Sequence, residues 1–140
     1  MFVVIVGSGR VGSTIAKRML GDGHEVSVLD EDPLSLEKLE VGMPSGWEDG
    51  GGRFTLGTAL EIEALIAAGV EEADVLICST TGDNTNLVVA QIAQKRFNVD
   101  KVIVRVLDPA RAEWYGRQGL HTICPTQQAI EMFEQAVLAT

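Results

Sequence analysis

The chain has 140 residues, of which 46% are hydrophobic and 22% are charged, and its formal net charge is −9 at pH 7. This length and composition predict one domain with enough apolar residues for a core. The acidic balance, without any cluster of lysine and arginine, argues against nucleic acid and anionic membranes as partners. The two cysteines lie in apolar runs, and the two histidines lie beside turn glycines, so no disulfide framework or metal site is predicted.

The first elements form a recognisable combination. Residues 2–6 are an apolar run typical of a buried strand, and they lead into Gly7-Ser8-Gly9-Arg10-Val11-Gly12 and a helical pattern. A second strand, residues 25–30, ends in Asp30. Strand, G-x-G-x-x-G, helix, strand and acid in this order make up a dinucleotide-binding fingerprint, whereas the glycine motif alone would be weak evidence.

Each position of this fingerprint has a chemical role. Gly7 allows the tight turn after the strand, Gly9 lets a pyrophosphate approach the backbone, and Gly12 lets the helix pack closely on the sheet. The helix N-terminus offers unpaired N–H groups to phosphates, and Asp30 can accept hydrogen bonds from a ribose diol. The alternative is a glycine-rich turn without a ligand, in which Gly9 would have little reason to be glycine.

The residues after Asp30 bear on the choice of nucleotide. Glu31 and Asp32 follow it, so a 2′-phosphate would meet three carboxylates and no arginine, which argues against NADP. The same residues do not separate NAD from ATP, ADP or AMP. Because Asp32 precedes Pro33, its more ordinary interpretation is a helix N-cap with proline at the first helical position.

The rest of the chain alternates between helical and strand patterns. A helix over residues 33–40 is followed by a glycine-rich loop, 41–52, which we expect to be flexible and to leave Trp47 partly exposed. The remaining strands are predicted at 53–56, 75–79, 101–107 and 121–124, and the remaining helices at 60–68, 86–96, 109–118 and 127–138. Asp83 and Thr126 are the expected caps of two of these helices.

This alternation predicts an α/β fold with a doubly wound, six-stranded parallel sheet in a single, Rossmann-like domain. In such a sheet the ligand lies outside the carboxyl ends of the strands, where the strand order reverses. Four loops fall on that edge: residues 7–12, 30–31, 57–59 and 79–82. We therefore expect the binding site to be formed by these loops.

Several stretches resemble the TrkA-N domain, the nucleotide-binding half of the RCK (KTN) regulators of potassium channels and transporters. The resemblance covers residues 2 to about 125. Its most specific parts are the Ala-Gly-Val…Ala-Asp stretch, residues 68–74, and the Thr-Thr-Gly-Asp-Asn-Thr-Asn loop, residues 80–86. The stretches that carry it are Val4–Gly12, Gly23–Val26, Leu29-Asp30, Ala68–Val70, Ala73-Asp74, Thr81–Asn86 and Val104-Arg105.

The resemblance implies a cytoplasmic regulatory subunit, without catalytic residues, that binds NAD(H) or ATP/ADP and gates a membrane partner from the inner face of the membrane. By position, the implied nucleotide-binding residues are Gly7, Ser8, Gly9, Arg10, Val11, Gly12, Asp30, Glu31, Gly57, Thr58, Ala59, Thr80, Thr81, Asn86 and Arg105. The main alternative is the cofactor-binding half of an NAD-dependent oxidoreductase, which would need a substrate domain and a general acid or base.

Two arginines have open roles. Arg105 lies within an apolar strand, where it would either meet a ligand phosphate or pair with Asp83 or Asp108. Arg10 would either reach a terminal phosphate of ATP or remain a solvated surface residue.

The chain is expected to divide at residue 125, into a nucleotide-binding domain, 1–125, and a C-terminal helix, 126–140, that serves assembly. The helical stretch 127–138 is apolar around much of its circumference, more than one stripe covering a sheet requires. We therefore expect a homodimer or larger assembly. The alternative is that this helix simply covers the sheet beside the last strand.

Overall fold

A six-stranded parallel sheet forms the centre of the computed structural model, which describes residues 1–140. Its strand order is β3-β2-β1-β4-β5-β6, and every neighbouring pair is parallel. The strands are β1 (Phe2–Val6), β2 (Glu25–Asp30), β3 (Arg53–Leu56), β4 (Val75–Cys78), β5 (Lys101–Arg105) and β6 (His121–Ile123). The order runs outward in both directions from β1 and β4, which confirms the predicted doubly wound topology.

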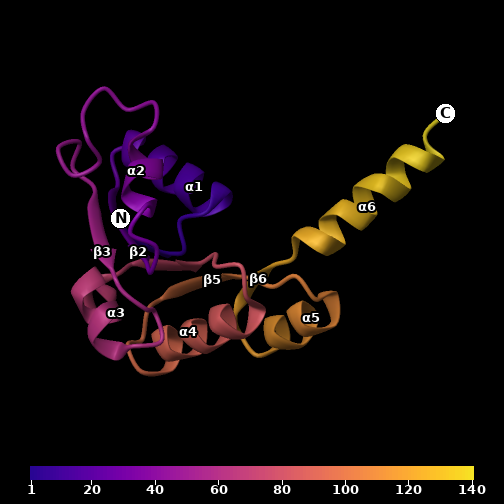
Figure 1. The fold of residues 1–140 in the computed structure, drawn as a ribbon. Coiled ribbons are helices and arrows are strands. Elements are labelled where there is room, and N and C mark those ends of the chain that lie inside the picture. The colour runs from indigo at the N-terminus through magenta and orange to yellow at the C-terminus, as the bar shows by residue number, and fades with distance from the viewer.

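Helices cover both faces of this sheet (Figure 1). Helices α1 and α2 lie on one face, and α3, α4 and α5 lie on the other, while α6 projects away from the rest of the molecule (Figure 1). The helices are α1 (Arg10–Gly21), α2 (Ser35–Glu40), α3 (Ile62–Ala68), the 3₁₀ turn η1 (Val70–Glu72), α4 (Asp83–Lys95), α5 (Pro109–Arg117) and α6 (Pro125–Leu138). None of them combines the length and the apolar character needed to cross a bilayer.

The two faces of the sheet have separate hydrophobic cores. The larger core, of 20 buried residues, lies beneath α3, α4 and α5, and the smaller one, of 8, lies beneath α1 and α2. All five residues of β1 are buried because the strand is central and covered on both faces. This explains why its sequence is a continuous apolar run instead of an alternating one.

Three predicted helix caps are wrong. Helix α2 begins at Ser35 with Leu34 as its N-cap, so Asp32 is not the cap and Pro33 is not the first helical residue; the Asp32 carboxylate accepts the Leu34 amide in the turn before the helix, at 2.9 Å. Helix α4 begins at Asp83 and its N-cap is Gly82, because the Asp83 carboxylate instead accepts hydrogen bonds from the amides of Leu107 and Asp108, at 2.8 and 3.1 Å. Helix α6 begins at Pro125, and the Cys124 sulfur, not the Thr126 hydroxyl, accepts the capping bond from an amide of the first turn. A proline at N1 suits this earlier start.

The prediction that Trp47 is partly exposed is also wrong. Its side chain is fully buried in the smaller core. The indole Nε1 donates to the carbonyl oxygen of Arg53 at 2.9 Å, and the Trp47 amide donates to the Glu40 carboxylate at 3.0 Å. A Cβ on Gly52 would lie 2.2 Å from the indole ring, so a glycine is required where the backbone crosses it. The 41–52 segment is thus folded over its own aromatic anchor.

Replacing this anchor tests the packing of the loop. Trp47→Ala should lower the free energy of unfolding by about 3–5 kcal/mol, because it removes a fully buried aromatic side chain. The matched control is Trp114→Ala, since Trp114 is half exposed on α5 and its replacement should cost less than about 1 kcal/mol. Urea unfolding followed by circular dichroism measures both, and equal losses would contradict this account of the loop.

Candidate functional site

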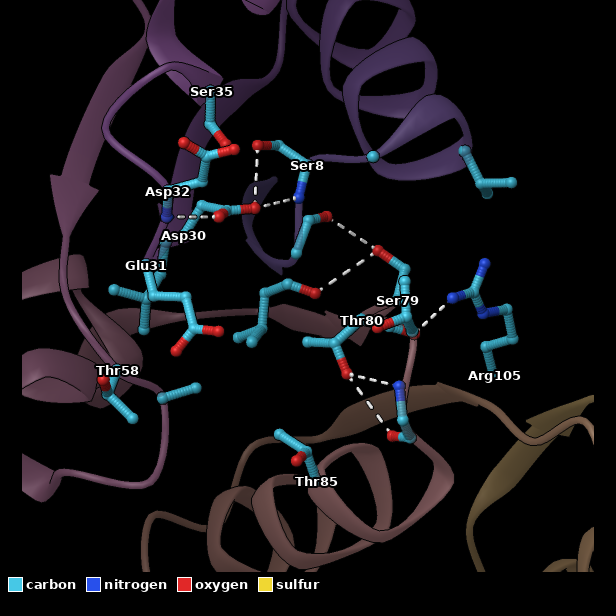
Figure 2. A pocket seen from close by; sticks show the side chains of 18 of the residues that line it. Ser8, Asp30, Glu31, Asp32, Ser35, Thr58, Ser79, Thr80, Thr85 and Arg105 are labelled. Carbon is cyan, nitrogen blue, oxygen red and sulfur yellow. Dashed lines mark hydrogen bonds between the residues drawn. The ribbon is translucent and has the colours of Figure 1, made fainter.

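A cleft of about 540 Å³ opens at the carboxyl edge of the sheet, around the point between β1 and β4 where the strand order reverses. Figure 2 shows its lining from close by. Thirteen of the fifteen residues predicted for the site line it: Gly7, Ser8, Gly9, Arg10, Val11, Asp30, Glu31, Gly57, Thr58, Ala59, Thr80, Thr81 and Arg105. The other two, Gly12 and Asn86, lie behind the lining. The four loops chosen from the sequence therefore meet at one place.

Gly7 and Gly12 are required by packing. Gly7 has a φ of +94°, and a Cβ there would lie 2.8 Å from the Thr80 amide nitrogen. A Cβ on Gly12 would lie 1.9 Å from the Gly7 carbonyl oxygen. The Ser79 hydroxyl donates to the same oxygen at 2.9 Å. These contacts bring the start of α1 and the loop after β4 together at the floor of the cleft.

Gly9 differs from both. Its φ of −70° suits any residue, and a Cβ at this position would meet no atom within 4 Å. Neither backbone conformation nor packing within the protein therefore requires glycine here. Gly9 lines the cleft, and it is the N-cap of α1 with no side-chain capping bond. The missing side chain leaves open space directly beside the amino end of a helix.

Asp30 holds the glycine loop to the end of β2. One carboxylate oxygen accepts from the Ser8 amide at 2.7 Å and from the Ser8 hydroxyl at 3.0 Å, and the other accepts from the Asp32 amide at 2.8 Å. Figure 2 shows these bonds converging on the carboxylate. Burial opposes ionisation, yet the bonds from the amides of Ser8 and Asp32 and the hydroxyls of Ser8 and Ser35 lower the pKa of Asp30 below 3.8.

Asn86 is a positioning residue on the opposite side of the cleft. Its side chain is buried, and its Oδ1 accepts from both the amide and the hydroxyl of Thr80, at 2.9 and 2.6 Å. Its Nδ2 donates to the carbonyl oxygens of Thr80 and Arg105, at 3.1 and 3.0 Å. These four bonds satisfy both N–H donors and both acceptor positions of the Asn86 side-chain amide, and they fix the loop after β4 against the end of β5.

Arg105 forms neither of the ion pairs considered from the sequence. Its guanidinium donates to the carbonyl oxygen of Thr80, and its Nε is buried without a hydrogen-bond partner. The only ion pairs within 4.0 Å in the structure are Lys38 with Asp32 and Arg117 with Glu113. The Arg105 charge therefore faces the cleft without a neutralising carboxylate.

Sequence reasoning missed some of the lining. Lys38 lies on α2, reaches the cleft and pairs with Asp32 at 3.7 Å. Ser35, Leu60, Ser79 and Thr85 also line the cleft. The predicted 79–82 loop already contained Ser79, but Lys38 carried no signal, because its position depends on how α2 packs beside β2.

The charge of Asp30 should contribute to stability in a pH-dependent way. Asp30→Asn removes the charged acceptor of the Ser8 bonds and should cost roughly 1–3 kcal/mol at pH 7. Because the folded-state pKa is lowered, the contribution is fully present above the unfolded value of about 3.8 and is lost as pH falls through the folded value. The difference between wild type and variant in urea unfolding should therefore shrink as pH falls below about 3.8.

The control for this variant is Asp22→Asn, since Asp22 is exposed at the end of α1 and its side chain forms no hydrogen bond or ion pair within the protein. Its effect should be small at every pH. An Asp30→Asn effect that stays constant from pH 7 to pH 3 would contradict the assignment of the Asp30 charge to the Ser8 tether.

Comparisons with known proteins agree with this architecture. The chain is 36% identical over 138 residues to the Trk system potassium uptake protein TrkA of Streptomyces coelicolor, an alignment that covers 99% of this chain and 59% of that relative. The chain thus spans about three fifths of the length of this relative.

Solved structures share the fold at lower identity. The TrkA-N domain of the inner membrane protein ybaL from Escherichia coli superposes with a TM-score of 0.80 at 20% identity, covering 99% of this chain and 96% of that one. The AMP-bound Kef CTD of Shewanella denitrificans gives 0.76 at 23% identity, covering 98% and 80%. GsuK bound to ADP gives 0.76 at 14% identity, covering 98% and 34%.

The model of the TrkA-N domain family matches residues 3–125, which include the whole sheet except Phe2, the first residue of β1, and all the residues that line the cleft. This chain belongs to the TrkA-N domain family.

Proposed function

We propose that this chain is the nucleotide-sensing part of a cytoplasmic regulator of potassium transport. It binds an adenine nucleotide with a free ribose 2′-hydroxyl, NAD(H) or ATP/ADP, and acts on a membrane transporter or channel subunit from the inner face of the membrane. The name of the Streptomyces relative supports potassium transport, and the AMP and ADP named for the Kef and GsuK structures support an adenine nucleotide.

The open space at Gly9 is the observation that carries this proposal. A glycine that neither φ nor packing demands, placed at the amino end of α1, leaves room for a ligand that approaches the backbone. The N-terminus of a helix attracts anions through its free N–H groups and its dipole. A pyrophosphate or phosphate group meets both conditions.

The two sides of the glycine loop have different roles. On the β2 side, Asp30 and Glu31 would accept hydrogen bonds from the ribose diol, and the 57–59 turn would border the adenine. The Ser8 and Ser35 hydroxyls are rotatable donors that a ribose hydroxyl can replace, while the two backbone amides keep the Asp30 carboxylate in place. On the β4 side, Thr80 and Thr81 border the continuation of the ligand.

The lining also favours a sensor over the oxidoreductase alternative. A dehydrogenase places a general acid or base beside the nicotinamide, commonly histidine or lysine. The cleft residues on the β4–β5 side are Ser79, Thr80, Thr81, Gly82, Thr85 and Arg105, and none is a histidine, lysine, cysteine or carboxylate. This residue set suits binding and recognition better than proton transfer.

Alanine at Gly9 tests the proposal directly. Gly9→Ala should leave the free energy of unfolding within about 0.5 kcal/mol of wild type, because the new methyl group enters open space. It should weaken ADP binding by at least about tenfold, since the methyl group occupies the place of a phosphate. Isothermal titration calorimetry measures the affinity, and urea unfolding measures the stability.

The matched control is Gly12→Ala, whose Cβ would collide with the Gly7 carbonyl oxygen. Unlike Gly9→Ala, this variant should lower the free energy of unfolding. Unchanged ADP affinity in a folded Gly9→Ala variant would remove the glycine loop from the binding site. Failure of wild type to bind ADP, ATP and NADH would overturn the proposed function.

Assembly through α6 is the second part of the proposal. The helix projects from the body, and none of its residues is buried (Figure 1). Its large exposed apolar residues are Ile130, Met132, Phe133, Val137 and Leu138, which are between 49% and 80% exposed. The alternative that α6 covers the sheet beside β6 is therefore wrong for this structure. We propose that residues 1–125 form the nucleotide-binding domain and that 126–140 join two copies of the chain.

Light scattering of wild type and of a chain truncated after Pro125 tests this role of α6. Wild type should be a dimer or larger at tens of micromolar, and the truncated chain should be a monomer that keeps its ADP affinity. Met132→Gln with Phe133→Gln is the milder variant, and it should weaken association without changing the domain. A monomeric wild type, or a truncated chain that associates as wild type does, would show that α6 does not hold the assembly.

A further inference from the structure

The carboxylates of the cleft all lie on one side of it. All three carboxylates of the lining, Asp30, Glu31 and Asp32, follow β2 or lie at its end. On the β4–β5 side, Arg105 is the only charged residue of the lining. Asp83, at the start of α4, does not line the cleft, and its two oxygens accept hydrogen bonds from the amides of Leu107 and Asp108. The β2 side of the cleft thus carries all three carboxylates together with Lys38, which pairs with Asp32, whereas the β4–β5 side, the cationic end, carries only the charge of Arg105.

The topology places the second half of a dinucleotide at the cationic end. With its ribose at Asp30 and its pyrophosphate at the glycine loop, NAD would cross the switch point and lay its nicotinamide over the ends of β4 and β5. Arg105 is the last residue of β5 and lies at this place. The nicotinamide ring of NAD⁺ carries a positive charge, whereas that of NADH is neutral and the terminal phosphates of ADP and ATP are negative.

The Arg105 charge is held in the cleft and is not compensated. The guanidinium is fixed by its bond to the Thr80 carbonyl oxygen, and no carboxylate lies within ion-pairing distance of it. Figure 2 shows the side chain turned toward the loop after β4. In a partly desolvated cleft such a charge repels a cation and attracts an anion more strongly than it would in water.

We propose that Arg105 is the residue that selects the ligand, so that the cleft favours nucleotides with a terminal phosphate, ADP and ATP, over NAD⁺. This inference rests on the proposed function and deepens it by choosing among adenine nucleotides. Arg10 at the start of α1 also lines the cleft and adds positive charge near the phosphates. Arg105 differs from it in lying where the nicotinamide would be, so Arg105 carries the discrimination against NAD⁺.

The test compares ligands that differ in charge at this end. Isothermal titration calorimetry of wild type should give an affinity for ADP at least about tenfold higher than for NAD⁺. It should also give a preference of several-fold for NADH over NAD⁺. The NADH and NAD⁺ pair is the sharpest probe, because the two share every group outside the nicotinamide ring. If Arg105 had only a structural role, replacing it would change the affinities for NADH and NAD⁺ by the same factor and leave their ratio unchanged.

Substitutions locate the effect. Arg105→Gln, which keeps a donor for the Thr80 carbonyl, should lower ADP affinity by about tenfold and bring the NADH to NAD⁺ ratio within about twofold of unity. Arg105→Lys keeps the charge and should keep the preference for NADH. The control is Arg18→Gln, an exposed arginine of α1 that is outside the cleft lining and makes the same change in net charge.

The outcomes separate this inference from the function on which it rests. ADP binding together with equal NAD⁺ and NADH binding would overturn the role of Arg105 and leave the nucleotide site standing. A preference for NADH that persists in Arg105→Gln would also overturn it. If neither ADP, ATP nor NADH binds, both proposals fail. If Arg105→Gln does not fold, the wild-type ligand series alone decides whether NAD⁺ is disfavoured.

Discussion

The close backbone contact between the turn after β1 and the loop after β4 is the constraint on which the cleft depends. Gly12 approaches the Gly7 carbonyl oxygen, Gly7 approaches Thr80, and the Ser79 hydroxyl bonds across the junction. A side chain at Gly12 would push α1 away from the turn after β1, and one at Gly7 would push the loop after β4 away from the same turn. Because the contact is tight, the amino end of α1 and the loop after β4 face the same small space. Packing within the protein therefore forms the cleft, and no ligand is needed to shape it.

Polar side chains then fix the loops around this junction. On one side, Asp30 accepts the Ser8 amide, and on the other Asn86 bonds to Thr80 and to the carbonyl oxygen of Arg105. Both are partly or fully buried, so an unpaired polar atom would be costly, and their bonds favour one loop arrangement. A site held in this way loses little conformational entropy when a ligand binds. Arg105 is the exception, with a buried Nε that has no partner and a charge that no carboxylate balances.

Local patterns explain what could be predicted from the sequence. The strands and most of the helices follow from apolar runs and turn residues, and the loops at the carboxyl edge follow from their order along a parallel sheet. The failures are contacts between distant segments. The burial of Trp47 could not be predicted, because nothing local shows that the glycine-rich loop folds back over its indole. The role of Asp83 could not be predicted either, because its amide partners lie in the loop after β5, more than twenty residues along the chain. Lys38 reaches the cleft only through the packing of α2.

A continuous set of contacts runs from the cleft to α6. The Arg105 carbonyl accepts from Asn86, the Val106 amide donates to the Ile123 carbonyl at 3.0 Å, and the Cys124 thiol contacts the Leu107 carbonyl at 3.6 Å. These contacts do not by themselves couple the cleft to α6. A ligand shifts the equilibrium between two conformations of a protein only if it binds them with different affinity.

The length and exposure of α6 would make a change in its direction largest at its C-terminal end. The helix has 14 residues and therefore extends about 21 Å, and with no buried residue its direction is set by the short link at Cys124. A small rotation at this link displaces the apolar end of the helix much more than it displaces the cleft. Because the Leu107 contact of Cys124 lies two residues from Arg105, the residues after β5 connect the lining of the cleft to the start of α6.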